Sequence, residues 1–242
     1  MQNLVKTLLL AISAIVGLIL VASIAVYLFF DPNEYRDDIS AAVKETTGRD
    51  LTIEGDLSLS LFPWLAVEIG RTELGNAEGF GEQPFIRFDE ASLSVRLLPL
   101  IFKRELSVGT ASIEGLAVDL AVAEDGRSNW DDLLTAQEET AEEPQDSVSE
   151  DVPTIEVGRI EVANANVTYR DAKAGASYSI SKLQIESDGV GPGDPFDVDA
   201  EFDFSAAELG GHVAIRGEAE ISDDMTRLSI AGLNVSGELR GI

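Results

Sequence analysis

The sequence has no cysteine, a single histidine and few basic residues. Against 44 Asp and Glu there are 17 Lys and Arg in 242 residues, which gives a formal net charge of −27. Without cysteine the chain cannot form a disulfide, a thiol nucleophile, a Cys-ligated zinc site or an iron–sulfur cluster. The acidic charge excludes nucleic acid as an expected partner, because a duplex binder needs a clustered basic surface.

Motifs that support catalysis or ion binding are scarce as well. The only imidazole, His212, lies in an alternating stretch, which predicts a solvent-facing side chain on a strand. No G-x-S-x-G elbow is present, and the glycine-rich stretch 75–81 lacks the Lys-Ser/Thr of a phosphate loop. The acidic run 197–203 resembles a calcium loop, but Phe202 stands where an EF-hand needs glycine. This run predicts a solvated strand face, with weak calcium binding as the alternative, and we expect no enzyme activity and no cofactor.

The chain does contain one long apolar run, from Leu8 to Phe30, without a charged residue. At about 1.5 Å per residue, a helix of this length crosses a hydrocarbon core of about 30 Å. Lys6 precedes the run and acidic residues follow it, so the positive-inside tendency predicts a cytoplasmic N-terminus. The alternative is a cleavable signal peptide with its small residues at 23–25, although the apolar run is longer than a typical signal sequence. Both interpretations export residues 31–242.

A helix is predicted directly after the apolar run. Asp31 can cap it, Pro32 suits its first position, and Gly48 ends it after Thr47. Its apolar residues at 35, 39, 42 and 43 form one stripe, as in an amphipathic helix.

From residue 51 onward apolar and polar residues alternate, which predicts about a dozen strands with one apolar face each. The alternation is interrupted at 135–152, where seven acids and no base occur. This segment predicts a disordered acidic linker. We therefore divide the chain into an anchor (1–30), a helix-and-sheet unit (31–134), the linker (135–152) and a continuation of the sheet (153–242).

The expected sheet has very few helices to cover its apolar face, and soluble monomers avoid a large wet apolar surface. The sheet can close as a sandwich or barrel, pack on a partner, or curl into a trough that holds acyl chains. In the trough, the expected lining consists of apolar strand residues, namely Leu57, Leu59, Leu61, Val67, Ile69, Leu93, Val95, Leu97, Val118 and Leu120.

Several motifs extend from the end of the apolar run into the second block of strands. They are Asp31–Arg36, Thr47–Leu51, Ile53–Leu57, Ser60–Leu65, Gly75–Phe80, Gly126–Leu133 and Val167–Asp171. Together they resemble the AsmA family of bacterial envelope proteins, and the resemblance covers most of the chain.

The resemblance implies a single-pass protein of the bacterial inner membrane with its bulk in the periplasm. Its first part is similar to the chorein-type start of bridge-like lipid-transfer proteins, with an antiparallel, curled, groove-like (taco-like) sheet. The implied function is phospholipid transport and outer-membrane biogenesis, with phospholipid acyl chains as the ligand. The alternative is a non-catalytic envelope assembly factor that binds outer-membrane proteins or a partner subunit through a closed β-sandwich. Family members usually continue for hundreds more residues, so the sequence resembles the beginning of such a chain.

Overall fold

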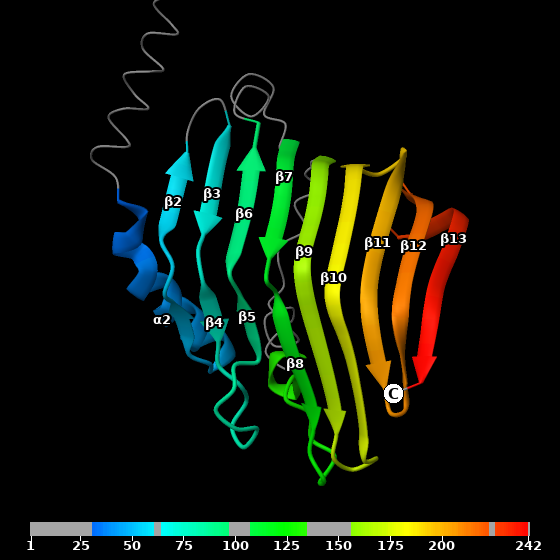
Figure 1. Ribbon diagram of the computed structural model, residues 1–242. Helices are drawn as coiled ribbons and strands as arrows, with labels where there is room; N and C mark the ends of the chain where they lie inside the picture. The colour runs from blue at the N-terminus through cyan, green and yellow to red at the C-terminus, as the bar shows by residue number, and fades with distance from the viewer. Residues whose placement is uncertain (1–30, 61–63, 97–106, 135–155, 223–225, 242) are drawn as a thin grey trace, which may run out of the picture.

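The computed structural model describes residues 31–60, 64–96, 107–134, 156–222 and 226–241. Almost all regular structure in these residues is β, as predicted, with one short helical segment at one end (Figure 1). None of the described helices is long and apolar enough to cross a membrane. The predicted anchor between Leu8 and Phe30 and the predicted linker at 135–152 lie outside the described residues.

All thirteen strands belong to one sheet. The strands are β1 (Leu51–Ile53), β2 (Leu57–Ser60), β3 (Leu65–Ile69), β4 (Thr72–Leu74), β5 (Ile86–Phe88), β6 (Glu90–Val95), β7 (Ser107–Glu114), β8 (Ala117–Val122), β9 (Glu156–Asp171), β10 (Ala176–Val190), β11 (Pro195–Ala206), β12 (Leu209–Ile221) and β13 (Leu228–Gly241). Two rows of short strands, β1-β4-β5-β8 and β2-β3-β6-β7, both end on β9, and the sheet continues from there through β10, β11 and β12 to β13.

The sheet is mixed, which corrects the expectation of a wholly antiparallel one. Strand β9 runs parallel to both β7 and β8, whereas the other strand pairs are antiparallel. A parallel neighbour needs a crossover instead of a hairpin, and the long connection at 123–155 supplies one. The sheet is also open, since β13 pairs with β12 alone. The described strands therefore do not form the closed sandwich that was considered as the alternative.

A line of backbone irregularities crosses the sheet between the two rows of short strands, and we call it the crease. Near one edge, Gly55 and Gly70 touch, because a Cβ on Gly55 would lie 2.5 Å from the carbonyl carbon of Gly70. Farther along, Asn164 in β9 and Lys182 in β10 have φ values of 54° and 51° where the ladder register shifts. Such bulges bend a strand and increase its twist. Figure 1 shows β4, β5 and β8 prolonging the lines of β3, β6 and β7 across the crease.

The helical segment forms as the sequence predicts. It consists of a 3-10 turn, η1 (Pro32–Tyr35), followed by α2 (Arg36–Thr47). The Asp31 carboxylate accepts a hydrogen bond from the backbone N–H of Asn33 at 2.9 Å, and Pro32 occupies the first position of the turn. At the other end, Gly48 adopts φ 73° and stops the helix.

The apolar stripe of α2 is not buried against the sheet. Tyr35 and Ile39 are 49% and 37% exposed, and only Val43 of the stripe is half-buried. The helical segment contacts the edge of the sheet instead. There, Asn33 accepts a hydrogen bond from the Leu57 N–H at 2.8 Å and donates one to the Leu57 carbonyl at 3.2 Å. The Asn33 amide thus occupies the outer edge of β2 as a neighbouring strand would.

A buried polar cluster joins the end of α2 to the segment that follows β8. Arg49 is 3% exposed and donates to the carbonyl of Asn129 at 2.6 Å and to the carboxylate of Asp132 at 2.9 Å. Its guanidinium lies 4.6 Å from the centre of the Phe85 ring. Asn129 is fully buried, and its side chain pairs with the backbone of β8 through the Ala121 N–H at 2.9 Å. Two of the motifs that carried the family resemblance therefore meet in one cluster.

Candidate functional site on one face of the sheet

The apolar residues of the first strands share one face of the sheet. Residues opposite each other in a ladder point to the same side. Leu57 lies opposite Ile69, and Leu59 lies opposite Val67, which in turn lies opposite Leu93. The alternation that predicted these positions therefore places them together in space.

The same face continues beyond the crease. Val118 lies opposite Val167, which lies opposite Ile180, and Ile180 lies opposite Phe204. Strand β11 has an unbroken register with β12, so its residues Phe204 and Ala200 point to the same side. Through its ladder partners in β10 and β9, Ala200 is connected to the row of strands β2-β3-β6-β7. The two halves of the surface are therefore continuous.

We call this surface the apolar face. It contains all the predicted lining positions that the structure describes; Leu61 and Leu97 lie outside the described residues. The members of the apolar face used below are Leu57, Leu59, Val67, Ile69, Leu93, Val95, Val118, Leu120, Val162, Val167, Tyr169, Tyr178, Ile180, Ile185, Ala200, Phe204, Ile215 and Val235.

The apolar face has no covering layer among the described residues. Val67 and Leu93 are 44% and 47% exposed although they lie in the middle of the first strands. Few hydrophobic side chains of the described chain are buried, namely Leu57, Phe85, Val108, Ala165, Phe196 and Ala219. Apolar surface costs about 25 cal/mol per Å² to keep in water. A continuous surface of this kind is therefore suited to an apolar occupant.

An aromatic group occupies the end of the apolar face beyond the crease. The rings of Tyr169 and Tyr178 stack with their centres 6.0 Å apart, and Trp130 lies 6.4 Å from Tyr169. Burial is the main cause that raises the pKa of Tyr169, with a smaller effect of the nearby Asp171 carboxylate. Sequence reasoning did not select these tyrosines, although both occupy alternating positions in their strands.

The opposite face carries the charges. Asp203 accepts hydrogen bonds from Lys182 at 2.8 Å and pairs with His212 Nδ1 at 2.9 Å, and these contacts lower the pKa of its carboxyl group. Arg216 pairs with Asp199 at 2.6 Å on the same side. His212 and most of the 197–203 acids are exposed, which confirms the prediction of a solvated strand face.

Together, the open sheet, its uncovered apolar face and its charged opposite face define a protein built on an amphipathic β-surface. The family model of the AsmA family matches residues 1–239, and the chain belongs to this family. This confirms the resemblance seen in the sequence, and family membership indicates a role in the bacterial cell envelope.

The chain is 24% identical over 225 residues to the protein named Protein AsmA of Escherichia coli (strain K12). The alignment covers 92% of this chain and 35% of that protein, so the chain spans about a third of the curated relative's length. No solved structure is significantly similar to the chain.

Proposed function

We propose that the protein is a lipid-binding groove of the periplasm that accepts phospholipid acyl chains and takes part in phospholipid transport and outer-membrane biogenesis. In this proposal the run from Leu8 to Phe30 anchors it in the inner membrane with a cytoplasmic N-terminus. The protein holds or conducts lipid and catalyses no reaction. The observation that carries the proposal is the continuous apolar face, which runs from β2 to β13 without a covering layer in the described chain.

The dimensions of the apolar face suit hydrocarbon chains. Nine strands follow one another along the sheet from β1 to β13, and a spacing of about 4.8 Å gives a surface roughly 40 Å long. One leaflet of a bilayer contributes about half of a hydrocarbon core of about 30 Å, so this surface is longer than one acyl chain. A lipid can therefore lie across the strands with its chains on the apolar face and its headgroup toward water.

The competing function is an assembly factor that binds an outer-membrane protein or a partner subunit. One observation favours it: all residues of β13 are exposed, and the outer edge of this strand has no neighbour in the described sheet. An open edge is a template for a strand of another chain. In that case a polypeptide, and not lipid, would cover the apolar face.

Site-specific photo-crosslinking in cells separates the two functions. We would place the crosslinker at Val67 or Leu93 on the apolar face, with Ser58 and Ser92 as matched controls. Ser58 and Ser92 both lie opposite Glu68, on the other face of the sheet. The proposal expects lipid adducts at the first pair and none at the second. Protein adducts without lipid at Val67 and Leu93 would establish the assembly factor instead.

A further inference from the structure

A hollow lies on the charged side of the sheet, away from the apolar face. It measures about 550 Å³ and is formed by the ends of β3, β6, β7 and β9. Ser94 in its floor lies opposite Ala66, and both residues alternate with members of the apolar face. We call this hollow the rim pocket, and its main lining residues are Ser60, Trp64, Glu68, Ser94, Thr110 and Arg159.

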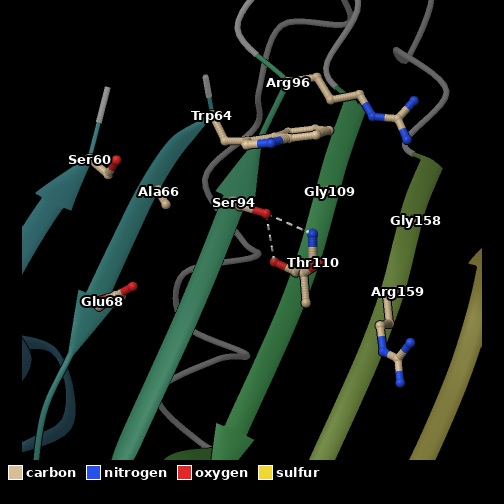
Figure 2. Close-up of a pocket in the computed structure, with 10 residues that line it drawn as sticks. All are labelled: Ser60, Trp64, Ala66, Glu68, Ser94, Arg96, Gly109, Thr110, Gly158 and Arg159. Carbon is tan, nitrogen blue, oxygen red and sulfur yellow. Dashed lines mark hydrogen bonds between the residues drawn. The ribbon is translucent and has the colours of Figure 1, made fainter. Parts of the chain in front are cut away.

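The indole of Trp64 forms one wall of the rim pocket. Figure 2 shows the ring almost edge-on, reaching from β3 across β6 toward β7, with Arg96 on one side and the floor residue Thr110 on the other. The Arg96 guanidinium lies 5.5 Å from the ring centre, as in a cation–π contact. The residue Trp64 is 41% exposed. One face of the indole is thus occupied by a cation, and the other looks over the pocket.

A glycine in β7 makes room for this arrangement. A Cβ on Gly109 would lie 2.7 Å from the Ser94 hydroxyl and 3.3 Å from the Trp64 ring. Any larger residue at this position would push the indole away from the sheet. The position of Trp64 therefore depends on the backbone beneath it.

The floor of the rim pocket offers hydrogen-bonding groups. The Ser94 hydroxyl accepts from the Thr110 N–H at 2.8 Å and is thereby held in place. The hydroxyls of Ser60 and Thr110 have no hydrogen-bond partner within the described residues. Glu68 accepts from the Ser58 hydroxyl at 2.9 Å through one oxygen of its carboxylate.

The charges around the rim pocket argue against an anionic ligand. Arg159 is surrounded by carboxylates at 3.2 to 3.6 Å, those of Glu186, Glu161 and Asp188. With Glu68, four carboxylates stand against the two guanidinium groups of Arg96 and Arg159 in the described residues. A phosphate would meet net negative charge there, whereas a neutral molecule would not be repelled.

We propose that the rim pocket binds an uncharged pyranose unit of a glycan or of a glycolipid headgroup. The C–H face of a sugar ring packs against the free face of Trp64, which supplies apolar contact area. The ring hydroxyls exchange hydrogen bonds with Ser60, Thr110 and the charged groups of Glu68 and Arg159. Because the pocket lies on the other side of the sheet, this binding is independent of the proposed lipid groove.

The test is saturation-transfer NMR on the full chain in lipid nanodiscs, because maltoside detergents would themselves carry a sugar. The probes are maltotriose and tri-N-acetylchitotriose. Inorganic phosphate, which has no C–H protons, serves as the anionic comparison and is followed by the broadening of its phosphorus NMR signal. We expect saturation transfer to the ring C–H protons of at least one oligosaccharide. Trp64→Ala should weaken binding of the sugar by about tenfold or more, because the contact between the sugar ring and the indole is lost.

Two further variants test this interpretation. Arg216→Ala changes an exposed residue of the same sheet face outside the pocket, and it should bind the sugar as the wild type does. Gly109→Ala should displace the indole and weaken sugar binding while the circular dichroism spectrum stays unchanged. Binding that is equal in the wild type and in Trp64→Ala would overturn the proposal. So would phosphate binding without sugar binding, or no transfer to either oligosaccharide. A glycolipid source is distinguished from a free glycan by co-purification of glycolipid with the wild type and not with Trp64→Ala.

Discussion

Arg49 and Asp132 are 83 residues apart in the sequence, yet the Arg49 Nη2 atom lies 2.5 Å from a carboxylate oxygen of Asp132. The arginine side chain is almost completely buried, whereas that of Asp132 is 41% exposed. This ion pair connects the end of α2 to the segment after β8. It thereby holds the start of the sheet against its middle.

Removing either partner should destabilise the protein, and removing the exposed one should cost at least as much as removing the buried one. Arg49→Ala leaves the Asn129 carbonyl and the Asp132 carboxylate without their donor, so we expect a loss of about 3 kcal/mol in unfolding free energy. Asp132→Ala leaves the guanidinium of Arg49, whose side chain is almost completely buried, without its counter-charge. Urea unfolding of the full chain in nanodiscs, followed by circular dichroism, measures both. An Asp132→Ala variant as stable as the wild type would contradict the assignment of burial.

The same pair predicts a dependence of stability on pH. The hydrogen bond from Arg49 lowers the pKa of Asp132 from its ordinary value. A group whose pKa is lower in the folded state binds fewer protons there than in the unfolded state. Its contribution is therefore present above the unfolded pKa of about 4 and is lost as pH falls through the folded pKa. Below pH 5, the melting temperature should therefore fall less steeply with decreasing pH in Asp132→Asn than in the wild type.

The crease predicts an intolerance of side chains at the edge of the sheet. A Cβ on Gly55 would lie 2.2 Å from the backbone nitrogen of Arg71. Gly55→Ala should therefore destabilise by about 3 kcal/mol, at the upper end of what overpacking costs. Gly241→Ala, where no atom lies within 4 Å of the added Cβ, is the matched control and should leave the melting temperature unchanged.

The Asn33 contact with Leu57 can be tested by hydrogen exchange. Asn33→Ala removes the acceptor of the Leu57 N–H, so exchange at this amide should accelerate, with a loss of about 1 kcal/mol in stability. Asn33→Asp keeps the acceptor and loses the Nδ2 donor, which serves the Leu57 carbonyl and the Asp31 carboxylate. It should therefore preserve most of the protection of that amide. Unchanged exchange in both variants would mean that the side chain does not close the edge of β2.

A charge on the apolar face should remove lipid without unfolding the sheet, provided that the position is exposed. Leu93→Asp meets this condition, because Leu93 is 47% exposed. Ser92→Lys places a charge on the opposite face of the same strand, directly across from Glu68, and serves as the control. We expect wild-type melting temperatures for both and loss of co-purified phospholipid, measured by mass spectrometry, for Leu93→Asp alone. Retained lipid in Leu93→Asp would count against the groove.

The sequence predicts the faces of the sheet well and its path poorly. Period-two alternation placed Leu57, Leu59 and Val67 on one surface because a strand's side chains alternate whatever its neighbours are. The direction of β9 could not be read, because alternation is the same for parallel and antiparallel neighbours. The bulges at Asn164 and Lys182 were also missed, since positive φ at residues other than glycine leaves no local signal.

For the site, the features that the sequence did not predict are contacts between segments far apart in the chain. The stripe with Tyr35 and Ile39 predicted an amphipathic helix, but its packing partner depends on Asn33 meeting the edge of β2. The position of the Trp64 ring, which forms one wall of the rim pocket, depends on Gly109 in another strand. Such pairings are set by tertiary structure and have no counterpart in a window of neighbouring residues.

The two edges of the sheet differ, and this gives the whole surface a polarity. At one edge the Asn33 side chain already uses the N–H and the carbonyl of Leu57. At the other, β13 offers an unoccupied row of backbone groups in the described chain. An additional strand, from whatever polypeptide, finds a free edge along β13, whereas the Asn33 side chain stands in its way at the start of β2. In the proposed lipid groove, strands added beyond β13 lengthen the apolar face away from the helical end.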